Sequence, residues 1–373
     1  MQPKRAPSTR RLVVKIGSST LTAGGDRLSR PQMLELVRQV AHLHQQGADV
    51  VIVTSGAMVT GREVLGFPKG RKDIPFKQVL AAVGQVRLMQ VWDQLFSLYG
   101  LVVAQTLLTR EDLADRQRYL NARNTLLALI ERRVVPIVNE NDVVGVDEIK
   151  IGDNDNLSAL VSNLIDADLL VLLTDIAGLY TADPRHDPAA TLIPEVREVS
   201  AAIEALAGKA GSDRGTGGMV TKLQAAKLAT ESGTAVVIAD GGVRDVLERL
   251  VAGEAIGTRF VPSDSQVESR KRWIISGLAS RGEVMVDNGA ALALLSGGKS
   301  LLPAGITGVN GHFERGDTIT IKDSGGRKLA CGVANYSAAD MARIRGLRSA
   351  EIEPILGFEY GEEAIHRNNL VLL

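Results

Sequence analysis

Short apolar runs alternate with longer amphipathic stretches from Leu12 to about Pro262. The apolar runs are continuous, which is typical of strands buried on both faces of a parallel sheet. The predicted strands are Leu12–Ile16, Val50–Thr54, Val102–Thr106, Val135–Asn139, Leu169–Thr174 and Ala235–Ala239. Predicted helices include Pro31–Gln46, Phe76–Leu98, Asn121–Arg132 and Met219–Ser232. The pattern therefore predicts a three-layer α/β sandwich with a mainly parallel sheet, whose ligand site lies beyond the carboxyl ends of the strands.

The pattern changes after Pro262, where a polar stretch predicts a linker over residues 263–280. Beyond it, short β-like runs are separated by glycines. These runs are Glu283–Val286, Thr318–Ile321 and Leu329–Val333. We therefore expect two domains, one over residues 12–262 and a small β-rich one over residues 281–373, as a length of 373 residues also favours.

Glycines and small polar residues directly follow five of the predicted strands. The five segments are Gly17-Ser18-Ser19, Thr54-Ser55-Gly56, Asn139-Glu140-Asn141-Asp142, Thr174-Asp175 and Ala239-Asp240-Gly241-Gly242. Because the carboxyl ends of parallel strands meet at one edge of a sheet, these hydrogen-bonding groups should gather there.

Lys15 lies near the end of the first predicted strand and is followed by Gly17, Ser18 and Ser19. The glycine would let a phosphate approach the backbone, whose amides are donors for an anion. The alternative is a lysine whose ammonium group lies in solvent. Neither the P-loop pattern nor the dinucleotide pattern G-x-G-x-x-G occurs, so a nucleotide site must be of another kind.

Two further segments combine glycines with the start of a predicted helix. Thr54-Ser55-Gly56-Ala57 would offer spare amides to a carboxylate or phosphate, unless Ser55 is simply the helix N-cap. Gly215 to Lys222 leads a glycine loop into a helix, where Lys222 would reach a terminal phosphate. The alternative for this second segment is a flexible surface loop.

The segment Gly152-Asp153-Asn154-Asp155-Asn156 precedes the apolar-periodic stretch Leu157–Ile165. One of these residues should cap that helix, but a simple cap needs only one, and the spacing does not fit a calcium-binding EF-hand. Together with Asp142, the segment would bind an amino-acid ammonium and orient lysines.

The five histidines lie outside all of these clusters, and we expect His42 and His44 on a solvated helix face. We also assign no protein ligands to a metal. The absence of a candidate base or nucleophile suits the phosphorylation of a carboxylate substrate. Such a substrate is already ionised at pH 7 and needs no general base. It needs positioning and neutralisation of charge, which lysines and Mg²⁺ supply.

Composition adds limits on partners and location. The chain has 43 basic and 43 acidic residues, so a polyanion partner is not indicated. The single cysteine, Cys331, is expected in the core and fits a reducing cytoplasm. Residues 1–11 are expected to be a flexible tail, and no apolar segment approaches the ~20 residues of a membrane span. We expect a cytoplasmic protein that does not enter membranes.

These motifs in combination resemble the amino acid kinase family, and within it the enzymes that phosphorylate glutamate. The resemblance covers essentially the whole chain. It implies transfer of the ATP γ-phosphate to the γ-carboxylate of L-glutamate with Mg²⁺ bound to ATP, the first step of proline biosynthesis. It also implies inhibition by proline, a homo-oligomer (dimer or tetramer), and delivery of the product to glutamyl phosphate reductase.

The resemblance assigns roles to individual residues. Lys15 and Lys222 would hold the transferring phosphoryl group, and Asp155 would position both lysines and favour their charged form. The residues that would bind glutamate are Ser55, Asp142 and Asn154. The residues that would contact ATP are Lys15, Thr174, Asp175, Thr216, Gly217, Gly218, Met219, Val220, Thr221 and Lys222.

The chain from about Arg281 resembles a PUA domain, chiefly in Gly282-Glu283-Val284, Gly297 to Ile306 and Phe313 to Asp317. PUA domains elsewhere bind structured RNA through shape and backbone contacts. The low aromatic content and mixed charge here favour a structural or regulatory module over a stacking-based RNA site.

Two rival functions remain at the level of sequence. One is a sibling kinase for N-acetylglutamate, aspartate, carbamate or UMP, against which the paired polar segments and the PUA-like domain argue. The other is an RNA-binding or RNA-modifying protein with an inactive kinase-like scaffold, against which the lysine pair Lys15 and Lys222 argues.

Overall fold

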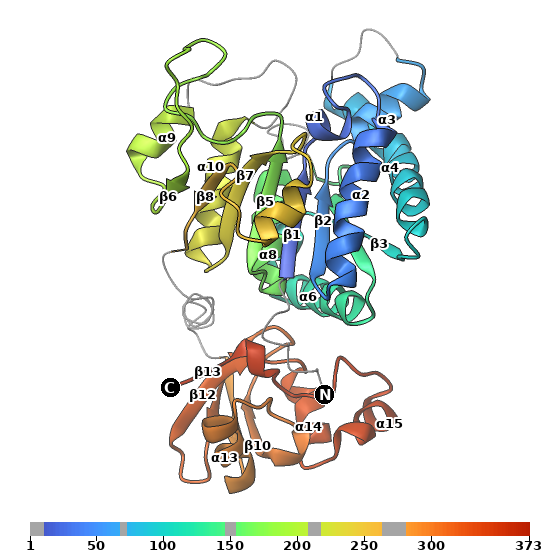
Figure 1. Ribbon diagram of the computed structural model, residues 1–373. Coiled ribbons are helices and arrows are strands. Elements are labelled where there is room, and N and C mark those ends of the chain that lie inside the picture. Colours follow the sequence, from blue (N-terminus) through green and yellow to red (C-terminus); the bar gives the residue numbers. More distant parts are fainter. Residues whose placement is uncertain (1–10, 68–72, 146–153, 208–217, 263–280) are drawn as a thin grey trace. The chain divides into compact units, whose positions relative to one another are not determined.

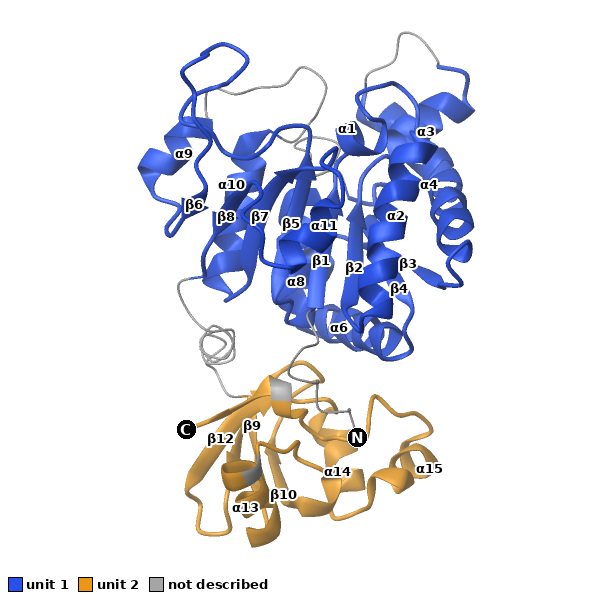
Figure 2. Cartoon of the chain, viewed as in Figure 1, with its two compact units in different colours: residues 1–265 blue, residues 266–373 orange. Residues whose placement is uncertain are grey.

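The computed structural model describes residues 11–67, 73–145, 154–207, 218–262 and 281–373 (Figure 1). The chain divides into two compact units, Met1–Ser265 and Gln266–Leu373 (Figure 2). Tail residues 1–10 and linker residues 263–280 lie outside the described residues. Arg11, which was expected in the tail, is the first residue of the first strand.

Unit 1 is built on a sheet that, in the described part of the chain, has the strand order β3-β4-β2-β1-β5-β7-β8-β6. The strands are β1 (Arg11–Ile16), β2 (Asp49–Thr54), β3 (Val103–Leu108), β4 (Val135–Glu140), β5 (Leu169–Thr174), β6 (Glu195–Val196), β7 (Ala235–Asp240) and β8 (Thr258–Phe260). All pairs are parallel except β7 with β8, so the predicted mainly parallel sheet is confirmed. β6 and β8 were not predicted, because two and three residues are too few to give a periodic signal.

Helices cover both faces of this sheet (Figure 1). They are α1 (Ser18–Leu21), α2 (Arg30–Gln45), α3 (Ala57–Val64), α4 (Ile74–Ser97), α5 (Arg110–Ala114), α6 (Arg116–Glu131), α8 (Asn154–Ile165), α9 (Ala201–Ala207), α10 (Met219–Glu231) and α11 (Val246–Val251). One core joins α2, α4 and α11 to alternate strand positions such as Val14 and Ile52. The other joins α6, α8 and α10 to the intervening positions, such as Val13 and Val53. The predicted three-layer sandwich is therefore confirmed.

α6 and α8 begin three or more residues earlier than the apolar periodicity predicts. The Asp115 carboxylate accepts a 2.9 Å hydrogen bond from the Arg118 amide, so α6 begins at Arg116 and not near Asn121. α8 begins at Asn154, which places Asn154 and Asp155 in its first turn. Gly152 and Asp153 lie outside the described residues.

Close packing of α3 on α4 fixes the segment after β2. A Cβ atom on Gly61 of α3 would lie 1.9 Å from the carbonyl oxygen of Leu80, and one on Gly84 of α4 would lie 1.8 Å from that of Ala57. Any side chain at either glycine would therefore push the helices apart. Gly56, with φ of 102°, makes the turn from β2 into α3. Ser55, the residue before it, is thus held in a defined place.

Unit 2 has a second sheet, with the order β10-β9-β11-β12-β13. Its elements are β9 (Gly282–Val286), α13 (Asn288–Gly297), η1 (Pro303–Gly305), β10 (Ile306–Gly311), β11 (Thr318–Lys322), β12 (Lys328–Val333), α14 (Ala338–Ile344), η2 (Ser349–Glu351), α15 (Ile352–Leu356), η3 (Arg367–Asn369) and β13 (Leu370–Leu372). The predicted β-rich character is confirmed, and Cys331 is buried as expected. β10 was not predicted because its two glycines and its Asn interrupt the apolar pattern.

Among the described helices, none combines the length and the apolar composition that crossing a membrane requires.

Candidate active site

The strand order places the predicted site residues side by side along one edge of the sheet. β1, which carries Lys15, lies between β2 and β5. Ser55 follows β2 on one side, and Thr174 ends β5 on the other side. Neighbouring strands lie about 4.8 Å apart, so these three residues span about 10 Å. Lys15 therefore stands between two groups of polar side chains.

Strand alternation directs Lys15 toward α8. Side chains of Val13 and Lys15 point to the same face, because they lie two residues apart in β1. Val13 belongs to the core that β1 shares with α8 and α10. Lys15 is 5% exposed, so the alternative of an ammonium group in solvent is wrong.

Asp155 joins two lysines that come from opposite ends of unit 1. Its Oδ1 lies 2.7 Å from Lys15 Nζ, and its Oδ2 lies 3.2 Å from Lys222 Nζ. The Asp155 side chain is 0% exposed. Lys222 lies in the first turn of α10, which begins at Met219 with Gly218 as N-cap. β1, α8 and α10 thus bring two cations and one carboxylate together in a buried cluster.

The pKa values of this cluster are set by burial and by mutual charge. Burial alone would raise the pKa of Asp155, but the charges of Lys15 and Lys222 outweigh it and lower the pKa to about 2. Burial lowers the pKa of Lys222; Asp155 opposes this effect, and the charge of Lys15 adds to it. The cluster therefore holds an ionised carboxylate beside a lysine that gives up its proton more readily than a free one.

This lowered pKa predicts how turnover depends on alkaline pH. A charged Lys222 is needed to neutralise a phosphoryl group, so kcat should begin to fall at a lower pH than the pKa of an ordinary lysine, ~10.4. The measurement is kcat against pH with both substrates saturating. In Lys222→Arg, residual turnover should persist to higher pH, because guanidinium stays charged. A wild-type kcat that stays flat up to the ordinary lysine pKa would contradict the assignment.

Thr221 binds the same carboxylate. Its hydroxyl lies 2.7 Å from Asp155 Oδ2 and 2.9 Å from the carbonyl oxygen of Gly218. The side chain is buried, and the Asp155 contact helps to lower the pKa of that carboxyl. The Thr221 side chain thus orients Asp155 in this structure.

On the other side of β1, Asn154 ties together the ends of two strands. Its Nδ2 has three acceptors within hydrogen-bonding distance, which share its two hydrogens: the carbonyl oxygen of Thr54 and Ser55 Oγ, both at 3.1 Å, and Asn139 Oδ1 at 3.0 Å. Gly56, not Ser55, is the N-cap of α3, so the alternative of Ser55 as a simple cap is wrong. The first turn of α8 therefore contacts both polar groups: Asn154 reaches β2 and β4, and Asp155 reaches β1 and α10.

Asp142 lies just beyond β4 and is 6% exposed. Gln78 of α4 donates a 2.9 Å hydrogen bond from Nε2 to the Asp142 carbonyl oxygen. The structure thus brings Ser55, Asp142 and Asn154 to the β2–β4 side of Lys15. Their contact with a substrate stays a prediction.

The β5 side of Lys15 holds the residues expected to contact ATP. Thr174 Oγ1 donates to Asp175 Oδ1 at 3.1 Å, and the negative charge of Asp175 acts to raise the pKa of Lys222. Met219 is buried and Val220 is 44% exposed at the start of α10. Thr216 and Gly217 lie outside the described residues.

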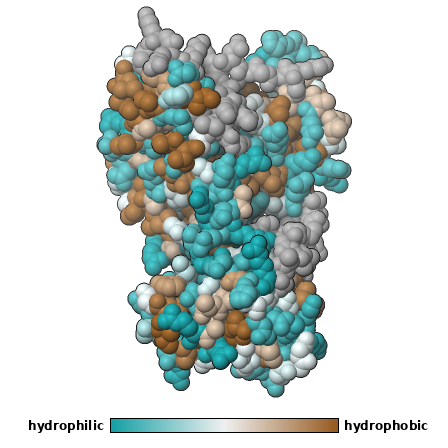
Figure 3. All heavy atoms as spheres, turned by 180° about the vertical axis from the view of Figure 1, so that it is seen from behind, coloured by the Kyte–Doolittle hydropathy of each residue, from teal (hydrophilic) through white to brown (hydrophobic). Residues whose placement is uncertain are grey.

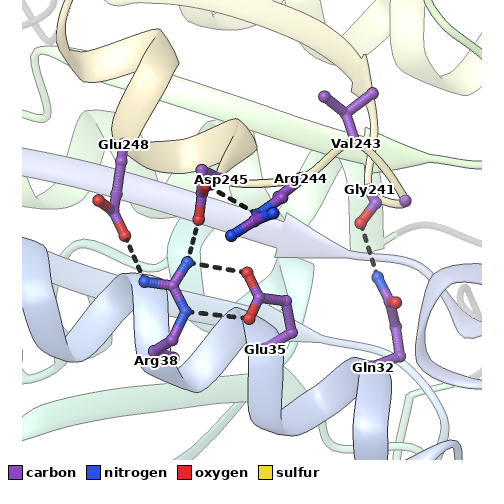
Figure 4. Close-up of a pocket in the computed structure, with 9 residues that line it drawn as sticks. Gln32, Glu35, Arg38, Gly241, Val243, Arg244, Asp245 and Glu248 are labelled. Atoms are coloured by element: carbon purple, nitrogen blue, oxygen red, sulfur yellow. Dashed lines mark hydrogen bonds and ion pairs between the residues drawn. The ribbon is translucent and has the colours of Figure 1, made fainter.

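A separate cavity of about 620 Å³ lies between α2 and the segment after β7 (Figure 4). Arg38 lines this cavity and forms ion pairs with Glu35 at 2.9 Å, with Glu248 at 3.0 Å and with Asp245. Gln32 Nε2 donates to the Gly241 carbonyl oxygen at 2.6 Å. These contacts join α2 to the loop after β7 and to α11. The polar groups named here are therefore already paired with one another.

Sequence reasoning missed Gln78 and Gln85 of α4. Both lie on the half-buried side of the helix, and Gln85 Oε1 accepts a 2.8 Å hydrogen bond from Asn139 Nδ2. They are seven residues apart, so two helical turns place them on one face. A polar pair at this spacing inside a largely apolar helix was the available signal.

The histidines need one correction. His44 is 7% exposed, so the expectation of a solvated side chain is wrong for this residue. Burial lowers the pKa of His44, which lies in α2 away from the lysine cluster. Within the described ranges, no group of three or more His, Cys, Asp or Glu side chains could hold a metal ion.

Comparison with known proteins places this architecture in a family. Residues 10–240 match the model of the amino acid kinase family, and residues 282–356 match that of the PUA domain. The chain belongs to the amino acid kinase family and carries a C-terminal PUA domain.

Curated relatives that carry the same enzyme name match nearly the whole chain. A protein named glutamate 5-kinase from Herpetosiphon aurantiacus is 58% identical over 361 residues, covering 97% of this chain and 98% of the relative. Another of that name, from Deinococcus radiodurans, is 54% identical over 363 residues, covering 97% of this chain and 100% of the relative. Among solved structures, the UMP kinase of Bacillus anthracis matches with a TM-score of 0.47 and 14% identity, over 68% of this chain and 97% of that one.

Proposed function

We propose that this chain is a glutamate 5-kinase, which transfers the γ-phosphate of MgATP to the γ-carboxylate of L-glutamate. The products are L-glutamyl 5-phosphate and ADP, in the first step of proline biosynthesis. The observation that carries the proposal is the buried cluster of Lys15, Asp155 and Lys222 between two groups of polar strand-end residues. Near-full-length identity of 54–58% to relatives named glutamate 5-kinase supports the choice of substrate.

The strand order supports a division of the site into two halves. In this proposal ATP lies on the β5 side, against Thr174, Asp175 and the segment Thr216–Lys222, and the Mg²⁺ ion enters with the ATP phosphates. Glutamate lies on the β2–β4 side, where Ser55, Asp142 and Asn154 bind it. The transferring phosphoryl group then lies between the two halves, where the lysines neutralise its charge.

The chemistry is an in-line displacement. A γ-carboxylate oxygen of glutamate forms a bond to the γ-phosphorus as the bond from phosphorus to the bridging oxygen of ADP breaks. No proton has to be removed from the nucleophile, because a carboxylic acid of pKa ~4.3 is ionised at neutral pH. Asp155 takes no proton in this scheme; it orients Lys15 and Lys222 for an acceptor and a donor held in line.

A substrate panel tests the proposal. ATP-dependent release of ADP should be fastest with L-glutamate and at least a hundred-fold slower in kcat/KM with N-acetylglutamate, aspartate, carbamate or UMP, because discrimination by paired polar groups reaches this size. Preference for UMP or N-acetylglutamate over glutamate would overturn the assignment to glutamate. Salt-sensitive RNA binding without ATP turnover would instead favour the scaffold alternative.

The proposal includes self-association as a dimer or tetramer. Hydrophobic side chains gather on the flank of unit 1 that carries α3 and α4 (Figure 3). Its exposed members include Val64 at 52%, Val79 at 49% and Val86 at 63%. Such a patch supports an interface with a second copy, and analytical ultracentrifugation would measure the oligomeric state.

The proposal also covers the regulation and the PUA domain. Proline would inhibit by binding near the glutamate site, and glutamyl phosphate reductase would receive the product. Inhibition kinetics and a coupled assay test these two points.

We assign the PUA domain a structural or regulatory role. The guanidinium of Arg315 lies 4.0 Å from the ring centroid of Tyr360 and covers a face on which a base would stack. The buried thiol of Cys331 suits a cytoplasmic location.

A further inference from the structure

Gln85 of α4 carries a buried polar atom whose hydrogen-bonding capacity is unused. Its side-chain Nε2 is inaccessible to solvent and has no hydrogen-bond partner among the described residues. A buried amide nitrogen without an acceptor is costly, and such groups are rare in folded proteins. A donor kept in this state is a candidate contact for a ligand.

The orientation of this amide follows from its neighbours. A backbone carbonyl can only accept, so the atom of Asn154 next to the Thr54 carbonyl oxygen must be the donor Nδ2. That nitrogen also donates to Asn139 Oδ1, which accepts a second bond at 2.9 Å from the Glu140 amide.

The remaining atom of the Asn139 amide, Nδ2, therefore donates to Gln85. Gln85 must receive this bond on Oε1, which leaves Nε2 directed away from Asn139. The chain of bonds thus fixes Gln85 Nε2 as a donor, and rotation of the amide would break the bond from Asn139.

The position of Gln85 indicates which part of the substrate it would meet. Asn139 lies in β4, two strands from β1 and thus about 10 Å from the strand of Lys15. Asn139 contacts Asn154 through its Oδ1 and Gln85 through its Nδ2, so Gln85 lies on the other side of the Asn139 amide from Asn154. Since the reacting γ-carboxylate must lie near the lysines, groups beyond Asn139 face the other end of the substrate.

A primary amide nitrogen can donate but cannot accept. It therefore suits a carboxylate and not an ammonium group, for which the carboxylate of Asp142 is the nearby match. We propose that Gln85 Nε2 donates a hydrogen bond to the non-reacting α-carboxylate of glutamate and so helps to select the substrate. This inference rests on the proposed function and adds a residue to it.

Gln85→Glu tests the proposal with little change in shape. One carboxylate oxygen still accepts from Asn139 Nδ2, while the other replaces the donor by a negative charge facing the substrate carboxylate. We expect KM for glutamate to rise roughly ten- to hundred-fold, with KM for ATP changed less than about two-fold, because the lost bond is charge-assisted and a repulsion replaces it. Gln94→Glu, an exposed position on the same helix, is the matched control and should leave both values unchanged.

A second substrate makes the test specific to the α-carboxylate. L-isoglutamine keeps the γ-carboxylate but has an uncharged α-carboxamide, whose nitrogen can donate to a carboxylate. Gln85→Glu should therefore shift the ratio of kcat/KM for L-isoglutamine over L-glutamate upward by at least ten-fold relative to wild type. Gln85→Met, which has neither donor nor acceptor, should raise KM for glutamate without this shift.

The outcomes separate the inference from the proposed function. A midpoint of thermal unfolding close to that of wild type shows that the fold of a variant is intact. If wild type turns over glutamate and both Gln85 variants keep its KM and its substrate ratio, the inference is wrong and the function stands. If wild type shows no glutamate-dependent ADP release, the proposed function itself fails.

Discussion

Replacing Lys222 by alanine should lower kcat by roughly a thousand-fold and leave KM for glutamate within about three-fold of wild type. The ammonium group of Lys222 would neutralise charge that develops on the transferring phosphoryl group, and removal of one such preorganised group typically costs 10²–10³ in rate. Glutamate would lie against Ser55, Asp142 and Asn154, which this change does not touch. Steady-state kinetics with saturating ATP would measure both constants.

Stability separates the catalytic role of Lys222 from a structural one. Burial lowers the pKa of this lysine, so its removal relieves the protein of a poorly solvated cation, and Asp155 keeps its pairing with Lys15 and Thr221. The free energy of unfolding should therefore change little. Lys227→Ala is the matched control, since Lys227 is half-exposed on the same helix and pairs at the surface with Glu204. Unchanged kcat in Lys222→Ala would refute its role.

Asp155→Asn should damage both activity and stability. The change leaves two lysines in a buried cluster without their shared carboxylate, and breaking a buried pair in this way costs about 3–5 kcal/mol. We expect kcat to fall by at least a hundred-fold, because neither ammonium group is then held in place. Chemical denaturation and steady-state kinetics measure the two effects, with the exposed Asp93→Asn on α4 as control.

The same carboxylate gives a pH signature. The pKa of Asp155 is about 2 in the folded protein and ~3.9 in an unfolded chain, so the unfolded chain binds the proton first as the pH falls. The stabilisation is therefore present above about pH 4 and is lost as the pH falls toward 2. Asp155→Asn should lack this component of acid unfolding. If Asp155→Asn and wild type have the same free energy of unfolding at neutral pH, the three-residue cluster does not form.

The sequence predicted the scaffold well because its signal is local. Continuous apolar runs marked the six long strands of unit 1, and the polar segments behind them marked the edge where Lys15, Ser55 and Thr174 gather. Period-two alternation also accounts for the direction of Lys15, which shares its face with Val13. Short elements such as β6 and β8 carry too few residues for such a pattern.

The contacts inside the site could not be predicted in the same way, because they join distant segments. Asn154 reaches Ser55 across 99 positions and Thr221 reaches Asp155 across 66, so no local spacing encodes either bond. Gln85 was part of a predicted helix with no special role. Its significance depends on the direction of hydrogen bonds through Asn139, which only the folded structure defines.

The most direct test of the central claim is to trap the acyl phosphate with hydroxylamine. An enzyme that phosphorylates the γ-carboxylate should form glutamate γ-hydroxamate in a one-to-one ratio with ADP, with both glutamate and ATP required. Lys222→Ala should form almost none under the same conditions. Release of ADP without hydroxamate, or turnover that does not depend on glutamate, would contradict the account.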